Sequence, residues 1–315
     1  MSGEDNRGQQ FSGLIAAPHT PMRPDFSLDL EKIAAQAALL KRAGLAGAFV
    51  CGTTGEGPSL SVAERMAVAE AWCNAADEGF AIIVHVGHNS LPECRRLAAH
   101  ARDIGAQAIA VCAPSFFRPR HVEELVEFCA GVASAAPEVA FYFYHIPEMT
   151  GVALPVRDFL QRAAQRIPTL AGVKFTHDDM KDYARCVRLL GGRFNMLFGR
   201  DEFLLAGLAL GARGAVGSTF NYAAPLYQRI VAAFSAGDWD TARREQARAA
   251  ELVEVLERYG GVPAGKAAIA MCGLDCGPPR PPLAALSAQQ VAALRGELEA
   301  IGFFDYCLRA EEPAS

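Results

Sequence analysis

Lys174 is the residue whose position is hardest to explain by packing alone. It lies inside the apolar run LAGVKFT (residues 170–176), with Val173 and Phe175 on either side. Burial in such a run lowers the pKa of a lysine because it disfavours the charged form, and the neutral amine can attack a carbonyl to form a Schiff base. The alternative is a structural lysine whose head pairs with a carboxylate such as Asp201.

Residues with hydroxyl groups lie at the ends of two other apolar runs. The segment GTTGE (residues 52–56) carries Thr53 and Thr54 between glycines, so two hydroxyls and exposed backbone N–H groups can converge on one small carboxylate. A turn that caps itself with its hydroxyls is the alternative. Tyr144 ends the run AFYFYHIP and supplies a phenol. Together these groups predict a site for a 2-oxo acid, in which Lys174 reacts with the carbonyl carbon and Tyr144 moves protons.

These residues fall at the ends of elements that alternate along the chain. Short apolar runs begin at residues 13, 47, 81, 108, 140, 170, 194 and 214, and longer amphipathic segments separate them, which predicts eight strands and their connecting helices. Strands without polar alternation must be covered on both faces, as parallel strands with crossover helices are. We therefore predict an α/β fold, a (β/α)8 TIM barrel, rather than a doubly wound open sheet, which would normally have fewer strands.

The predicted catalytic barrel spans residues 11–233. After it the strand pattern stops, and residues 234–315 are predicted to form a C-terminal helical extension around the Gly/Pro-rich segment GLDCGPPRPPLAAL. Residues 1–10 are polar and predicted to be a flexible N-terminus. A capping box, Ser61 with Glu64, predicts the start of one barrel helix.

Strand periodicity predicts the direction of Lys174. In a strand, residues two apart share a face, so Gly172, Lys174 and Thr176 lie on one side. Ala171, Val173 and Phe175 then share the other side, which should pack on the helices. Lys174 should therefore point into the mouth of the barrel, where active sites of this fold are found.

The composition favours a small-molecule ligand. The 315 residues carry a net charge of -5 without a cluster of Lys and Arg, so nothing favours nucleic acid or an anionic membrane as a partner. No apolar run approaches the roughly 18 residues of a membrane span, and we expect a cytoplasmic protein. The nine cysteines lie in apolar segments and are predicted to be free thiols. Neither Cys272 with Cys276 nor His85 with His88 has the further ligands that a metal site needs, so no metal is expected.

Four motifs in order resemble the N-acetylneuraminate lyase and dihydrodipicolinate synthase superfamily of class I, pyruvate-dependent aldolases. They are GTTGE, YHIPEMTG, GVKFTHDD and the segment FGRDE followed by GARGAVGSTFN. The resemblance implies that Lys174 forms the Schiff base, that Tyr144 is the general acid/base, and that Thr53 and Thr54 bind the pyruvate carboxylate. It implies no metal or other cofactor, because the protonated imine is itself the electron sink, and it implies a homotetramer.

Within that superfamily the sequence is more similar to the lyase branch. Met149 stands where the synthases typically have an arginine for a second carboxylate, and Phe116 and Phe117 stand where they have tyrosines. The lyase pattern implies that the hydroxyl groups of a sugar-derived substrate contact Thr176, Gly199, Asp201, Glu202 and Ser218. The alternative for Asp201 and Glu202 is a favourable charge at a helix N-terminus.

The resemblance thus implies a carbon–carbon lyase that cleaves N-acetylneuraminate reversibly to N-acetylmannosamine and pyruvate. The nearest alternative is a lyase or dehydratase for another sugar-derived 2-oxo acid, such as 2-keto-3-deoxygluconate, with a dihydrodipicolinate synthase disfavoured. Arg200 places a positive charge near the mouth, which would suit an acidic sugar or a different 2-oxo acid. A sensor that binds a 2-oxo acid or sugar acid without catalysis is the alternative outside enzymes.

Overall fold

The computed structural model describes residues 10–310, and its centre is a closed barrel of eight parallel strands in sequence order. β8 pairs with β1 and closes the barrel. The strands are β1 (Gly13–Ala16), β2 (Gly47–Val50), β3 (Ala81–His85), β4 (Ala108–Cys112), β5 (Ala140–His145), β6 (Leu170–Phe175), β7 (Asn195–Phe198) and β8 (Gly214–Gly217). The predicted (β/α)8 TIM barrel is confirmed.

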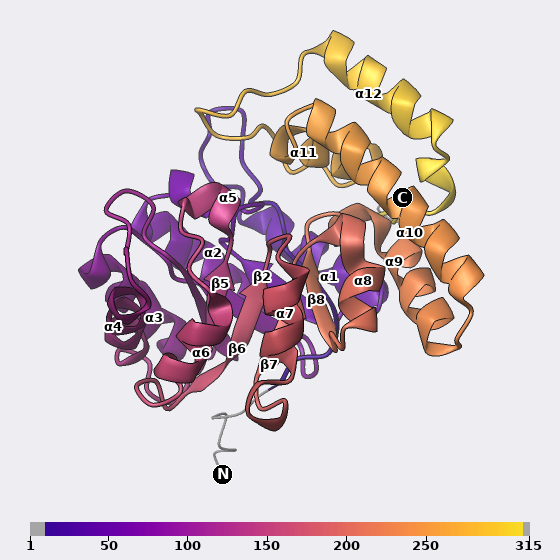
Figure 1. Ribbon diagram of the computed structural model, residues 1–315. Coiled ribbons are helices and arrows are strands. Elements are labelled where there is room, and N and C mark those ends of the chain that lie inside the picture. The colour runs from indigo at the N-terminus through magenta and orange to yellow at the C-terminus, as the bar shows by residue number, and fades with distance from the viewer. Residues whose placement is uncertain (1–9, 311–315) are drawn as a thin grey trace.

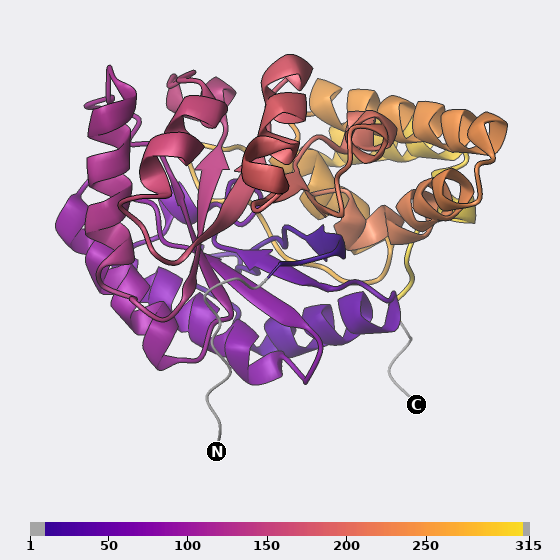
Figure 2. The same ribbon diagram turned by 60° about the horizontal axis from the view of Figure 1, so that its bottom comes forward.

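Helices surround the strands, as Figures 1 and 2 show. Those of the barrel are α1 (Glu31–Arg42), α2 (Val62–Ala75), α3 (Leu91–Asp103), α4 (Val122–Ala133), α5 (Pro147–Thr150), α6 (Val156–Ala163), α7 (Met180–Val187), α8 (Leu204–Ala209) and α9 (Phe220–Ser235). Four short 3-10 helices are η1 (Gly57–Ser59), η2 (Leu189–Gly191), η3 (Asp201–Phe203) and η4 (Phe303–Asp305). The predicted capping box at the start of α2 is present, since Ser61 Oγ accepts from the Glu64 backbone and the Glu64 carboxylate accepts from Ser61 N.

Three further helices follow the barrel: α10 (Trp239–Arg258), α11 (Val262–Met271) and α12 (Ala288–Ala300). α10 and α11 pack against α9, and α12 packs against α10 and α11, on the right of Figure 1. The predicted division at residue 233 falls inside α9, near its end, and stays a prediction. The predicted flexible N-terminus, residues 1–10, lies outside the described residues except for Gln10.

The buried apolar side chains form two layers. The larger lies between the strands and the helices, and the smaller fills the barrel interior. Val173 and Phe175 belong to the outer layer, while Tyr142 and Tyr144 belong to the inner one, as alternation predicts. Ala171 differs from the prediction because it belongs to the inner layer. The pairing of β5 with β6 shifts register next to it, which interrupts the simple alternation.

Between residues 10 and 310, no helix has both the length and the apolar character needed to cross a membrane.

Candidate active site

Lys174 points into the barrel mouth from β6. Its Cα pairs with that of Tyr144 on β5, and its Nζ lies 4.0 Å from the centroid of the Phe49 ring and 4.1 Å from that of Tyr144. Burial lowers the pKa of Lys174 from 10.5 to about 7, and the negative charge of Asp201 partly opposes that shift. In about half of the protein molecules the Lys174 side chain is therefore a free amine at pH 7. For a lysine at its ordinary pKa the fraction would be about one in three thousand.

The ammonium of Lys174 has no ion-pair or hydrogen-bond partner among residues 10–310. The alternative of a structural pair with Asp201 is therefore wrong. The Asp201 Oδ2 instead accepts from the Thr219 backbone at 2.9 Å, from the Thr219 hydroxyl at 2.6 Å and from Ser218 Oγ at 3.4 Å. All three donors hold Oδ2, whereas Lys174 has no such partner within residues 10–310 and is usable as a nucleophile.

Tyr144 faces the same cavity and contacts the loop after β2. Its hydroxyl lies 3.3 Å from Thr53 Oγ1, and its ring packs edge-on against Phe49 and His85. Burial raises the pKa of Tyr144 above its ordinary value of 10, so the phenol keeps its proton near neutral pH. A neutral phenol beside a hydroxyl can pass a proton on by accepting one and donating another.

The GTTGE loop is held in a strained turn and tied to the C-terminal helices. Glu56 has φ 55°, in the left-handed region, and its carboxylate makes a fully buried ion pair with Lys266 of α11 at 2.8 Å. The same carboxylate accepts from the Arg280 backbone at 2.6 Å. Thr20 donates to the Gly55 carbonyl at 2.6 Å. These contacts fix the backbone on which Thr53 and Thr54 stand, and Thr54 is itself buried.

Two glycines bring the predicted sugar-contacting groups close together. A Cβ at Gly217 would lie 2.3 Å from Asp201 Oδ1, and a Cβ at Gly199 would lie 2.0 Å from Thr176 Oγ1. Neither approach is possible for a residue with a side chain. Thr176 Oγ1 is buried and has no hydrogen-bond partner in the described part of the chain, so it can serve a ligand. Burial raises the pKa of Asp201, although the Thr219 and Ser218 donors and the Lys174 charge oppose this.

Glu202 lies at the rim and is held by Arg200. The Arg200 Nε is 2.7 Å from Glu202 Oε1, and its other nitrogens pair with Glu148 at 2.9 Å and Asp178 at 3.0 Å. The positive charge of Arg200 is therefore already matched by three carboxylates. This contradicts the hypothesis that it is free to bind an acidic sugar.

The sequence interpretation missed two residues of the site. Phe49 forms the floor beneath Lys174, and Thr219 is the main donor to Asp201. A signal existed for both, since Phe49 is the bulky central residue of the GAFVC run and Thr219 directly follows Ser218.

His85 also lines the site, from the end of β3. Its Nδ1 lies 3.1 Å from the Cys51 carbonyl, and burial lowers its pKa to about 3, so the ring is neutral. No group of three or more His, Cys, Asp or Glu side chains suited to a metal occurs in the range 10–310. All nine cysteines are free thiols, as predicted.

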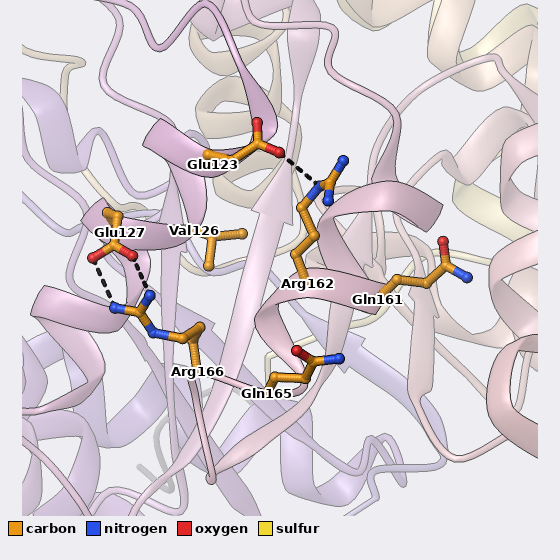
Figure 3. Close-up of a pocket in the computed structure, with 7 residues that line it drawn as sticks. All are labelled: Glu123, Val126, Glu127, Gln161, Arg162, Gln165 and Arg166. Atoms are coloured by element: carbon orange, nitrogen blue, oxygen red, sulfur yellow. Dashed lines mark hydrogen bonds and ion pairs between the residues drawn. The ribbon is translucent and has the colours of Figure 1, made fainter.

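A hollow on the outside of the barrel is separate from this site. Figure 3 shows it between α4 and α6, where Glu123 pairs with Arg162 at 3.0 Å and Glu127 with Arg166 at 2.6 Å. None of the predicted site residues lines it. Its charged residues are outside the set of predicted site residues and serve as controls.

The fold and the site together define a (β/α)8-barrel protein with an unpaired, desolvated lysine at the ends of its strands, an arrangement suited to Schiff-base chemistry. The chain belongs to the dihydrodipicolinate synthetase family, which matches residues 10–301. The predicted superfamily is thereby confirmed.

Similar proteins are N-acetylneuraminate lyases. The chain is 43% identical over 298 residues to the N-acetylneuraminate lyase of Gallus gallus, with 93% of this chain and 97% of that protein covered. The solved N-acetylneuraminate lyase of Proteus mirabilis is similar with a TM-score of 0.91 and 44% identity, over 94% of this chain and all (100%) of that one. The native structure from Aliivibrio salmonicida has the same TM-score and identity, with 94% and 98% covered.

Proposed function

We propose that this protein is a Schiff-base aldolase that cleaves N-acetylneuraminate reversibly to N-acetylmannosamine and pyruvate. The observation that carries the proposal is the Lys174 amine, which is buried, unpaired and directly across from Tyr144. The similarity to N-acetylneuraminate lyases along nearly the whole chain supports the choice of substrate.

The reaction begins at the carbonyl carbon of the 2-oxo acid. The neutral amine of Lys174 adds to it, and loss of water together with uptake of one proton from solvent gives a protonated imine. Thr53 and Thr54 hold the neighbouring carboxylate through hydroxyl and backbone N–H groups. This fixes the reacting carbon above the amine and beside the phenol of Tyr144.

Bond cleavage then needs one proton to leave and one electron pair to be stored. Tyr144 accepts the proton of the C4 hydroxyl as the C3–C4 bond breaks, and the electron pair moves into the imine to give an enamine. Because burial raises its pKa, Tyr144 passes its own proton on to substrate groups and water instead of persisting as a phenolate. Protonation of the enamine at C3 and hydrolysis of the imine release pyruvate and restore Lys174.

Substrate selection belongs to the rim and to the groups around Asp201. Hydroxyls of the sugar-derived tail contact Thr176, Gly199, Asp201, Glu202 and Ser218, since carboxylates and hydroxyls with open lone pairs are suited to reading a polyol. Exposed Met149 offers no cation for a second carboxylate of the kind a dihydrodipicolinate synthase would need.

The chain itself supplies all the groups of this mechanism, so we propose no cofactor. We also propose a cytoplasmic homotetramer. Phe116 and Phe117 are 76% and 87% exposed, an apolar surface that a neighbouring subunit would cover.

The test is to trap the imine. The protein is incubated with pyruvate and borohydride, and mass spectrometry should find the reduced adduct on Lys174, with the Lys174→Met variant as the negative control. Pyruvate release is then measured with N-acetylneuraminate and with 2-keto-3-deoxygluconate. Absence of an adduct would refute every Schiff-base mechanism, whereas an adduct without release from N-acetylneuraminate would refute only the choice of substrate.

A further inference from the structure

Arg200 ties together the loops that follow the three strands carrying the chemistry. It lies just after β7, while Glu148 lies in α5 after β5 and Asp178 in the loop after β6. Each guanidinium nitrogen faces a different carboxylate, at 2.7 Å for Glu202, 2.9 Å for Glu148 and 3.0 Å for Asp178. One planar cation with five N–H donors can hold all three at once.

This arrangement, the Arg200 clamp (Arg200, Glu148, Asp178 and Glu202), has an excess of negative charge. Three carboxylates and one guanidinium give three negative charges against one positive, a net of -2. The buried carboxylate of Asp201 follows Arg200 directly in the chain and adds to the same sign. The rim above Lys174 therefore repels an anionic group, even though it contains an arginine.

The clamp also fixes the position of the Glu202 carboxylate at the rim. Glu202 Oε1 forms an ion pair with Arg200 Nε at 2.7 Å. The side chains of Arg200 and Glu202 are 18% and 19% exposed, so both are largely removed from water. A carboxylate held in one position by an ion pair is preorganised to accept a hydrogen bond from a substrate hydroxyl.

We propose that Arg200 is a positioning residue that does not bind the substrate but holds three carboxylates at the rim. The net negative charge of this clamp restricts the enzyme to aldehyde partners whose tail is an uncharged polyol and rejects those with a second carboxylate. The inference rests on the proposed aldolase function. It reverses the expectation that an arginine at the mouth would attract an acidic sugar.

The experiment compares two acceptors in the condensation direction with pyruvate. Mannose and mannuronate differ only in the carboxylate at C6, so the ratio of their kcat/KM values isolates the effect of the charge. The wild-type protein should prefer mannose by at least about tenfold, because like charges brought together at an interface are strongly unfavourable. The preference should shrink as salt is added.

Two variants should move this ratio in opposite directions. Arg200→Gln removes the only cation of the clamp and should widen the preference for mannose, while raising KM for N-acetylneuraminate about tenfold with kcat changed much less, as expected when a charge-assisted contact that positions a binding group is lost. Arg200→Lys should restore part of KM. Glu148→Gln removes one negative charge from a half-exposed position and should narrow the preference.

Matched controls separate this inference from the proposed function. Arg162→Gln and Glu123→Gln make the same charge changes in the outer hollow of Figure 3 and should leave the ratio unchanged. Imine trapping with pyruvate is measured in every variant. If the wild-type protein gives no adduct on Lys174, the proposed function fails. If trapping is intact but mannuronate is used as well as mannose, this inference alone is overturned. It is also overturned if Glu148→Gln and Arg200→Gln shift the ratio of kcat/KM values in the same direction. Should Arg200→Gln not fold, the Glu148→Gln result and the salt dependence still decide it.

Discussion

Replacing Lys174 with methionine should make the protein more stable, and by an amount that depends on pH. In the folded protein burial holds the pKa of Lys174 at about 7, whereas in the unfolded chain the lysine returns to 10.5. Between these two values the unfolded chain binds more protons than the folded protein, so lowering the pH favours unfolding. Methionine has a similar length and no charge, and it removes this effect.

The magnitude follows from the difference between the two pKa values. A shift of 3.5 units (10.5 minus 7) corresponds to about 5 kcal/mol at 1.36 kcal/mol per unit. The full destabilisation is present below pH 7 and is lost as the pH rises through 10.5. It should amount to about 4 kcal/mol at pH 7 and about 2 kcal/mol at pH 9.

The assay is urea unfolding of the wild-type and Lys174→Met proteins at pH 7, 8 and 9. Protein concentration is kept fixed, because association between subunits makes stability depend on it. The free energy of unfolding of the variant should exceed that of the wild type, and the excess should fall by about 2 kcal/mol from pH 7 to pH 9. Lys181→Met, on the exposed side of α7, is the control and should show no such trend.

Two results would refute the reasoning. A difference that does not change with pH would mean that burial does not lower the pKa of Lys174. A Lys174→Met protein that is less stable than the wild type at pH 7 would mean that the ammonium has a structural partner after all.

Three further predictions test other parts of the site. Imine trapping with pyruvate should rise with pH through an apparent pKa near 7, and Asp201→Asn should move this pKa downward, since the Asp201 charge raises it; an upward shift would contradict the assignment. Tyr144→Phe should lower kcat for cleavage about a hundredfold or more while pyruvate is still trapped, and an unchanged kcat would contradict the role of Tyr144 in the cleavage step. Lys266→Met should reduce the free energy of urea unfolding by about 3–5 kcal/mol because it leaves Glu56 buried and unpaired, and adding Glu56→Gln should recover much of the loss.

Most of the barrel could be predicted because its signals are local. Each strand is a short run without polar alternation, and the polar residues that interrupt or follow those runs lie at the strand ends where the fold collects them. The alternation of side chains along a strand also correctly predicts that Lys174 and Tyr144 face the same cavity. It failed at Ala171, since a shift in pairing between two strands leaves no mark in either strand's own sequence.

Contacts between distant segments could not be predicted. Glu56 meets Lys266 across 210 positions of chain, and nothing near either residue indicates the other. The sequence indicates no partner for Arg200 in distant segments, because Glu148 and Asp178 come from separate loops that only the closure of the barrel brings together. An ion pair depends on side-chain geometry, which the periodicity of a strand does not specify.

The two buried lysines of this chain show why burial alone does not identify a reactive amine. Lys266 and Lys174 are 3% and 4% exposed, so both have lost nearly all of their water. For Lys266 the lost hydration is replaced by Glu56 at 2.8 Å and by the Pro278 carbonyl at 2.8 Å. These partners keep the side chain in its ammonium form, which has no lone pair for chemistry. Lys174 lies over two aromatic rings, and the Asp201 carboxylate nearby has its Oδ2 in hydrogen bonds with Thr219 and Ser218. These donors hold Asp201 where its charge raises the pKa of Lys174 only in part, so burial remains the larger effect and the amine stays reactive.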